Sequence, residues 1–228
     1  PPTIETAGIM RSVKSRVALS TVVGVLVMAL TGCSQSQIYA TDKFTGTYVA
    51  IPNGWNKIEK SELDKAESKS TAPGAAEKLA NVLWHEAYTT SPEVTATQIL
   101  NLQAPVGAAV YVRVRALDFS EINSISYNSL RNLLVPITTW LEDPAKANPK
   151  FVLIDDYERV EKVARGVRTI YTFEDAAGVS ETVDQTALIS DDRTKIYILV
   201  VRAKTKYYNK HVDELLAIGD SFTVRGDK

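Results

Sequence analysis

Residues 110–116, Val-Tyr-Val-Arg-Val-Arg-Ala, are the part of the sequence from which the fold is best inferred. Small apolar side chains occupy every second position, and Tyr111, Arg113 and Arg115 stand between them. Successive side chains of a strand point to opposite faces, so this alternation predicts a strand that is half buried. Residues 196–201, Ile-Tyr-Ile-Leu-Val-Val, are apolar at every position and predict a central strand covered on both faces.

The remaining elements follow from the same two periodicities. Other strands are predicted at 44–51, 82–87, 151–163, 167–173, 182–189 and 221–224. One helix is predicted from the spacing of Tyr127, Leu130, Leu134 and Ile137, with Pro136 ending or kinking it. The last helix carries Tyr208, Val212, Leu215 and Leu216, and Gly219 is predicted as its C-cap. Strands joined by tight turns, with the helices grouped elsewhere, predict an α+β domain with an antiparallel sheet covered by helices.

The domain organisation is predicted to be simple. Residues 44–228 are expected to form one domain, preceded by a polar tether over 33–43. The polar stretch 61–80 is expected to be a surface excursion with a short helix, and 89–107 a long connection. The stretch 61–80 is not expected to be a domain boundary, since the strands before it are too few to fold alone.

The first 33 residues have the pattern of an export signal. Basic residues after Met10 precede an apolar run of 14 residues, Val17 to Leu30, which is too short to span a bilayer comfortably. The run ends in Leu30-Thr31-Gly32-Cys33, which resembles the lipobox of bacterial lipoproteins. We therefore expect cleavage after residue 32 and acylation of Cys33; an uncleaved anchor followed by a free cysteine is the alternative. Residues 1–9 precede this pattern and receive no function.

Composition excludes several classes of protein. The chain has 228 residues, 26 basic against 27 acidic side chains and 45% apolar residues, which is typical of a globular protein. This balance excludes a polybasic nucleic-acid binder. A single cysteine excludes an internal disulfide and a thiolate zinc cluster. Without residues 1–32 the net charge is −3, as suits a tethered domain that is not held at the membrane by its charge.

Catalytic and metal-binding patterns are weak. His85-Glu86 begins like the zinc motif H-E-x-x-H, but position 89 is Thr. His85 is interpreted as a partly buried strand residue, with a metal-ligand role completed by distant residues as the alternative. His211 is expected to be solvated, and Asp155-Asp156 and Asp191-Asp192 to be edge and turn residues. An enzyme that uses His85 with scattered carboxylates would need a convergent acid–base pair that the sequence does not show.

Basic and aromatic residues gather before the last helix. Lys204, Lys206, Tyr207 and Lys210 are interpreted as a candidate docking surface for an acidic partner, with an ordinary solvated face as the alternative. A nucleic-acid partner is not expected, because the chain is predicted to be exported and is net acidic.

Several motifs, spread over most of the chain after residue 33, resemble the PsbP family, especially its cyanobacterial lipoprotein (CyanoP-like) branch. They are Pro52-Asn53-Gly54-Trp55, Val82-Leu83-Trp84-His85-Glu86, Arg131-Asn132-Leu133-Leu134-Val135-Pro136, Thr169-Ile170-Tyr171, Lys195-Ile196-Tyr197 and Ser221-Phe222. The chain departs from the family in its longer 61–80 and 89–107 segments and in Tyr207 or Tyr208 where a Trp is common. Asp184 falls where plant members carry a His that is proposed as a metal ligand.

The resemblance implies an α-β-α sandwich with a central antiparallel sheet. It also implies a non-catalytic accessory or assembly factor of photosystem II, lipid-anchored on the lumenal face of the thylakoid membrane. A divalent metal ion is a further expectation, for which the resemblance implies Asp184 as a ligand and the residue pattern gives His85 as a separate candidate. The alternative is a lipoprotein of the same fold at the periplasmic face of a bacterial membrane, which binds a small ligand or another envelope protein.

Overall fold

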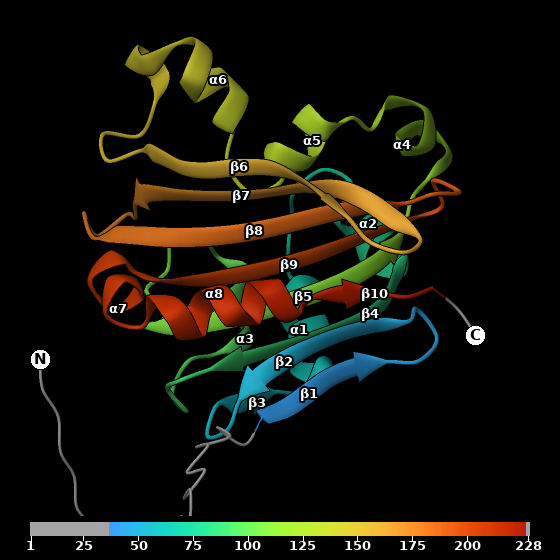
Figure 1. Cartoon of the computed structure of the whole chain (residues 1–228), viewed down its shortest axis with the longest axis horizontal. Coiled ribbons are helices and arrows are strands. Elements are labelled where there is room, and N and C mark those ends of the chain that lie inside the picture. Colours follow the sequence, from blue (N-terminus) through green and yellow to red (C-terminus); the bar gives the residue numbers. More distant parts are fainter. Residues whose placement is uncertain (1–36, 227–228) are drawn as a thin grey trace, which may run out of the picture. The chain divides into compact units, whose positions relative to one another are not determined.

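The computed structural model describes residues 37–226, whose strands form two antiparallel sheets (Figure 1). The larger sheet has seven strands in the order β3-β4-β5-β9-β8-β7-β6, and the smaller has the order β1-β2-β10. The strands are β1 (Gln37–Asp42), β2 (Thr47–Pro52), β3 (Asn56–Ile58), β4 (Val82–Thr89), β5 (Ala108–Ala116), β6 (Val152–Val160), β7 (Ala164–Glu174), β8 (Ser180–Ser190), β9 (Lys195–Lys204) and β10 (Thr223–Val224).

The helices are short and lie between the strands in the sequence. They are α1 (Lys60–Glu67), α2 (Ala75–Ala80), α3 (Ala96–Leu100), α4 (Phe119–Ser124), α5 (Tyr127–Arg131), α6 (Ile137–Glu142), α7 (Thr205–Lys210) and α8 (Val212–Ser221), with a 3-10 turn at Pro144–Lys146. No helix within residues 37–226 combines the length and apolar character needed to cross a membrane.

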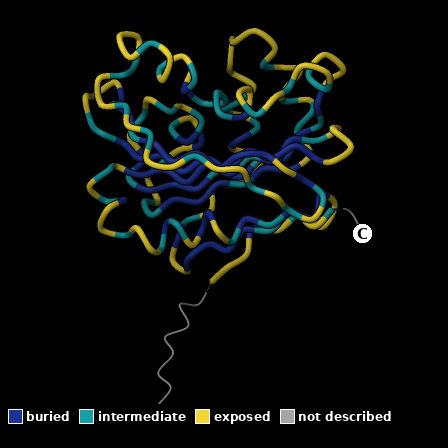
Figure 2. The backbone as a smooth tube through the Cα atoms, turned by 45° about the horizontal axis from the view of Figure 1, so that its top comes forward, coloured by how far each residue is buried: buried dark blue, intermediate teal, exposed yellow. Residues whose placement is uncertain are grey.

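The two strands predicted most directly from the sequence lie side by side in the larger sheet. β5 pairs with β4 and β9, and β9 pairs with β5 and β8. Val110, Val112 and Val114 are fully buried on one face of β5, as their alternation predicts. The burial pattern (Figure 2) shows the same result for the sheet as a whole, whose central strands are buried along most of their length.

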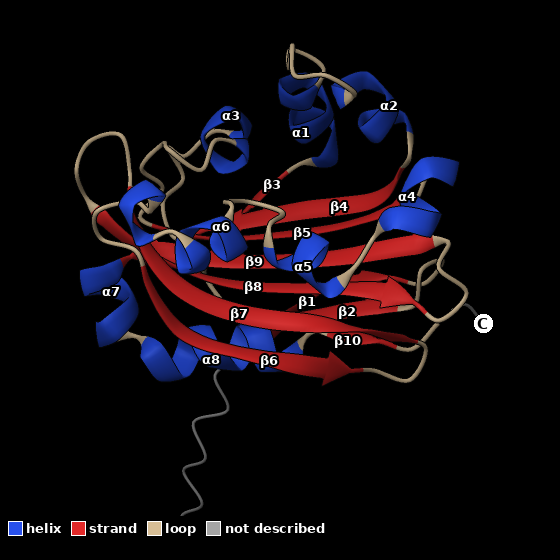
Figure 3. Ribbon diagram, turned by 90° about the horizontal axis from the view of Figure 1, so that it is seen from above, coloured by secondary structure: helices blue, strands red, loops and turns tan. Residues whose placement is uncertain are grey.

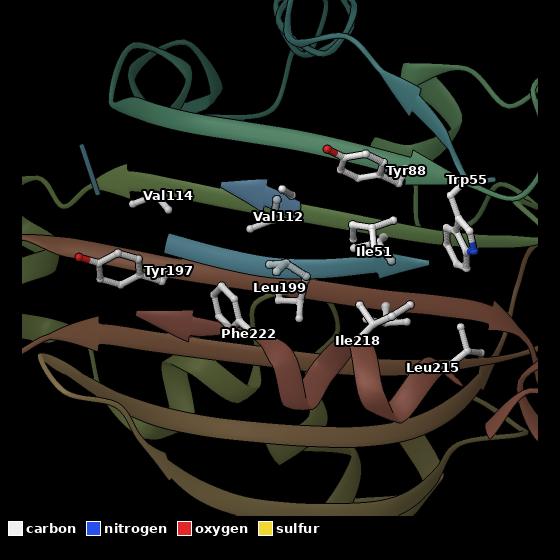
Figure 4. Close-up of a cluster of buried hydrophobic side chains, with 14 of the residues drawn as sticks. Ile51, Trp55, Tyr88, Val112, Val114, Tyr197, Leu199, Leu215, Ile218 and Phe222 are labelled. Carbon is white, nitrogen blue, oxygen red and sulfur yellow. The ribbon is translucent and has the colours of Figure 1, made fainter. Parts of the chain in front are cut away.

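Each face of the larger sheet has its own covering layer (Figure 3). Helices α1 to α6 lie over one face, and α7, α8 and the small sheet lie over the other. The largest core cluster (Figure 4) joins Val112 and Leu199 of the large sheet to Ile51 of β2 and to Ile218 and Phe222 at α8. Burial of this apolar surface drives the layers together. The predicted α+β fold, with an antiparallel sheet covered by helices, is confirmed.

The tether predicted over residues 33–43 is wrong for residues 37–42. These residues form β1, which pairs with β2 along its whole length, and Ala40 is fully buried in the core. The local sequence is polar, so its strand character depends on pairing with β2, which a local pattern does not reveal. The folded domain therefore begins by Gln37. The predicted signal region 1–32 and Cys33 lie outside the described residues.

Two helix predictions also need correction. The helix expected over Tyr127 to Ile137 is divided, because Ser126 caps α5, the helix ends at Asn132, and Pro136 is the N-cap of α6. Gly219 is not a C-cap; it lies inside α8 and is buried. The short helix predicted within 61–80 is confirmed, since α1 and α2 lie there.

Candidate functional site

His85, the candidate metal ligand on β4, lies fully buried beneath α1. Its Nε2 atom is 2.9 Å from Oδ1 of Asp64 on α1, and its Nδ1 atom is 3.3 Å from the hydroxyl oxygen of Tyr111 on β5. Both ring nitrogens therefore have protein partners. These hydrogen-bond contacts attach helix α1 to the sheet.

The protonation of this cluster follows from its burial. Burial lowers the pKa of His85 below its ordinary value of 6.5, although Asp64 opposes the shift, so the ring is neutral at pH 7. Arg113 donates to the Tyr111 hydroxyl at 3.2 Å, which leaves the hydroxyl proton to be donated to Nδ1 of His85. Nε2 then carries the ring proton and donates it to Asp64. Burial also raises the pKa of Tyr111 to about 12, so the hydroxyl stays protonated.

Arg113 extends the cluster toward the 61–80 segment. Its Nη1 atom donates to Oε1 of Glu67 at 2.5 Å, and its Nη2 atom donates to the carbonyl of Lys78 at 3.1 Å. Lys60 forms an ion pair with Asp64 at 2.6 Å on the outer side of α1. These bonds hold α1 and the end of α2 on β4 and β5, which explains how a polar insertion becomes part of the folded domain.

Asp184, the other candidate ligand, lies on β8 in a separate buried ion pair. Arg168 on β7 donates from Nε and Nη2 to the two carboxylate oxygens of Asp184, at 2.8 and 2.6 Å. Arg168 also donates to the Tyr157 hydroxyl, to Asp220 and to the carbonyl of Leu216. Although burial opposes it, the two carboxylates raise the pKa of Arg168, which remains cationic.

The structure does not bring His85 and Asp184 together. β5 and β9 separate their strands in the sheet. His85 faces α1, whereas the partners of Asp184 contact α8, and these helices lie over opposite faces of the sheet (Figure 3). The two candidate metal ligands therefore do not share a site. Between residues 37 and 226, no cluster of three or more His, Cys, Asp or Glu side chains is arranged to hold a metal ion.

The predicted basic and aromatic surface is assembled around α7. Lys206 and Lys210 are exposed and stand four residues apart, on one side of the helix. Lys204 is exposed at the N-cap of the helix. The Tyr207 ring stacks on His211 with 4.2 Å between ring centroids and 19° between the ring planes.

The neighbouring Tyr208 points the other way and is buried in the main core. A shallow hollow of about 400 Å³ begins at Lys210 and His211 and continues over the first turn of α8, where Asp213 and Glu214 lie. Helix α7 thus has one side fixed in the core and one side that displays lysines next to a stacked aromatic pair.

Sequence reasoning missed two further arrangements. Arg202 and Glu181 form a buried ion pair at 3.2 Å, and Arg202 also donates to carbonyls at and just after α3. Lys43, Lys162 and Arg225 border one cavity, although more than 100 residues separate Lys43 from Lys162. The only sequence signal for the ion pair is the position of Arg202 between apolar neighbours on β9. No local signal predicts the cavity.

Comparison with known proteins gives likenesses in fold. No family model matches the chain, and no curated protein matches it. The solution structure of cyanobacterial PsbP (CyanoP) from Synechocystis sp. PCC 6803 matches with 13% identity over 84% of this chain and 94% of that chain, with a TM-score of 0.47. LpqN of Mycobacterium tuberculosis, a protein involved in cell envelope biogenesis, matches with 13% identity over 83% and 90%, with a TM-score of 0.44. The Ran-binding protein Mog1p of Saccharomyces cerevisiae matches with 9% identity over 84% and 96%, with a TM-score of 0.40.

These are similarities to a PsbP-type fold at low identity. At 9–13% identity the likeness describes architecture and assigns no function to this chain.

Proposed function

We propose that this protein is a lipid-anchored, non-catalytic accessory protein that docks a membrane protein complex through the basic face of α7. The observation that carries the proposal is the display of Lys206 and Lys210 on one side of α7, next to the Tyr207–His211 stack. Lysine charges steer encounter with an acidic surface, and a stacked aromatic pair adds contact area with little flexibility to lose.

The support beneath this face favours the same function. Tyr208 fixes α7 in the core, and α8 is held by Arg168 and by Arg159, which donates to the carbonyls of Gly219, Asp220 and Phe222. A surface already held in place loses little conformational entropy when a partner binds. The buried polar groups His85 and Asp184 also serve as internal ties in this arrangement, because each is engaged by neighbouring side chains.

Location and partner come from the sequence. Acylation of Cys33 would place the domain on the outer side of a membrane, within reach of membrane complexes. In a photosynthetic source, the PsbP-like motifs favour photosystem II on the lumenal side of the thylakoid membrane. In another source the partner would be an envelope protein at the periplasmic face. The proposal of an acidic docking partner for α7 is the same in both.

The test is a pull-down of the tagged full-length lipoprotein from gently solubilised membranes, followed by mass spectrometry. We expect the double variant Lys206→Glu, Lys210→Glu to recover the partner complex at least ~10-fold less than wild type, because reversed charges repel an acidic surface. Lys65→Glu, Lys69→Glu is the matched control, since these lysines are also exposed and four residues apart.

Photosystem II subunits among the specific partners would support the photosynthetic form of the proposal, and envelope proteins alone would support the other form. Equal recovery of the complex by wild type and by the α7 variant would overturn the proposed docking face.

A further inference from the structure

A second charged site lies at the opposite end of the β1–β2 hairpin from the start of β1. There an open cavity of about 590 Å³ is bordered by three segments: the turn between β1 and β2, the turn between β6 and β7, and the chain after β10 (Figure 1). Its lining residues are Lys43, Phe44, Gly46, Tyr48, Lys162, Arg225 and Gly226. Each of the three segments contributes one cation to this cavity.

These three cations have no acidic partner among residues 37–226. Lys43, Lys162 and Arg225 are all exposed, and the Arg225 guanidinium carbon lies 5.0 Å from the centroid of the Tyr48 ring. The ring holds the guanidinium through a cation–π contact and leaves its N–H donors unused by carboxylates. The site is therefore locally positive, although the whole chain has a net charge of −1.

Carboxylates close to these cations in the chain, or beside the cavity, are engaged by other groups. Glu161, next to Lys162, pairs with Arg159 at 3.1 Å and accepts the N–H of Val224 at 3.4 Å. Asp42 accepts a hydrogen bond from the backbone N–H of Thr45 at 2.8 Å. Asp191, in the adjoining hollow, pairs with Arg165 at 3.2 Å, and Asp192 beside it accepts from Ser190 and Thr194. None of these carboxylates pairs with Lys43, Lys162 or Arg225, so carboxylates among residues 37–226 do not use the donors of the three cations.

The frame of the cavity is fixed by close backbone contact. Gly46 has a φ of 63°, and its carbonyl accepts the N–H of Arg225 at 2.9 Å. A Cβ atom at position 46 would lie only 2.6 Å from the carbonyl carbon of Gly226. Glycine at 46 therefore permits the hairpin turn and the C-terminal segment to meet, which brings Lys43 and Arg225 to one cavity.

Exposed aromatic side chains lie on the same hairpin as Lys43. Phe44, which lines the cavity, is 67% exposed, and Tyr39 on the edge strand β1 is 65% exposed. Aromatic side chains favour the boundary between lipid and water. β1 begins four residues after Cys33, a distance that the extended chain covers in about 14 Å. An acyl chain on Cys33 would thus keep this edge close to the bilayer.

We propose that the cavity binds the phosphate of an anionic phospholipid headgroup while Phe44 inserts at the membrane surface. Two lysines and an arginine supply the charge-assisted donors that a phosphate accepts, and arginine can bind two of its oxygens at once. The proposal rests on the lipid anchor in the proposed function. It goes beyond that function by giving the domain its own contact with the lipid.

The test uses residues 35–228, which form one compact unit with its own core and carry no acyl chain. Binding is measured by co-sedimentation with vesicles of phosphatidylcholine alone and with vesicles that also contain phosphatidylglycerol, at low ionic strength. We expect at least ~10-fold tighter binding to the anionic vesicles. Lys162→Glu, Arg225→Glu should remove this preference, whereas Lys65→Glu, Lys69→Glu, with the same change of charge, should keep it.

Two further arms identify the source of the phosphate and separate this site from α7. Phe44→Ser should weaken vesicle binding, and Lys206→Glu, Lys210→Glu should leave it unchanged, so failure of the α7 docking proposal would not mimic failure here. Equal binding to both vesicles would overturn the proposal. So would displacement from anionic vesicles by inorganic phosphate at concentrations comparable to those of the lipid, because the site would then serve a soluble phosphate.

Discussion

Gly219→Ala is the substitution for which helix propensity and tertiary structure predict opposite signs. Alanine is the better helix former by about 1 kcal/mol, so local propensity alone predicts that the change stabilises α8. Gly219, however, faces the buried pair of Arg168 and Asp184. A Cβ atom at this position would lie 2.8 Å from Cζ of Arg168 and 2.8 Å from Oδ2 of Asp184, closer than nonbonded atoms approach.

The expected loss of unfolding free energy follows from the displacement of the Arg168–Asp184 pair. Overpacking of a tight interior costs about 1–3 kcal/mol. Loss of a partner from a buried ion pair costs about 3–5 kcal/mol, and here the pair is displaced without being deleted, so only part of that cost applies. After subtraction of the propensity gain, we expect Gly219→Ala to lower the free energy of unfolding by about 2–4 kcal/mol.

The assay is urea unfolding of residues 35–228, followed by tryptophan fluorescence at constant pH. Ala217→Gly is the control, because Ala217 is exposed on the same helix and reports the propensity term alone, about 1 kcal/mol. A Gly219→Ala variant as stable as wild type, or more stable, would refute the close packing of α8 on the Arg168–Asp184 pair.

Three other predictions concern charged and polar groups at other positions. Because burial holds the pKa of His85 below 6.5, the unfolded chain binds a proton first as the pH falls, so the contribution of His85 to stability is full above about pH 6.5 and declines below it by at most about 1.4 kcal/mol per pH unit. In pH-dependent urea unfolding, His85→Gln should remove this component, whereas His211→Gln should retain it. Arg202→Met should lower the free energy of unfolding by about 3–5 kcal/mol at pH 8, and by less at lower pH, because burial raises the pKa of Glu181 and favours its protonation. A loss of stability that does not depend on pH would contradict this explanation. Arg159→Ala should lower the free energy of unfolding by about 2–3 kcal/mol in thermal unfolding, because three carbonyls at the end of α8 lose a charged donor. An unchanged midpoint of the transition would argue against that role.

The sequence predicts the centre of the large sheet well because the signal there is local. Alternation in β5 and the continuous apolar run in β9 each follow from which faces of one strand are covered, and the burial of Val112 confirms the pattern. β1 was missed because its strand character depends on β2, with which it pairs residue by residue. The spacing from Tyr127 onward suggested one helix, since periodicity alone does not register the cap at Ser126.

The candidate sites show the same limit. His85 and Asp184 were each identified, but only the strand order and the direction of each side chain reveal that they face opposite layers. Lys206 and Lys210 could be predicted as a surface because they lie on one short helix. The cavity lined by Lys162 could not be predicted, because its lining residues come from three segments that lie far apart in the sequence.

In the acylated protein the proposed headgroup site would be a second membrane contact in addition to the lipid anchor. β1 has six residues, so about 20 Å separates its start from the turn that carries Phe44. A tethered site experiences an effective ligand concentration in the millimolar range, so the headgroup affinity that the unacylated domain shows for anionic vesicles would keep the site occupied in the acylated protein. A headgroup contact at this turn, in addition to the acylated Cys33, would restrict how the domain turns on the membrane, whereas one flexible anchor does not. Loss of the cavity cations should therefore leave the acylated protein on the membrane while weakening docking through α7, because that face would no longer be held in one orientation toward its partner.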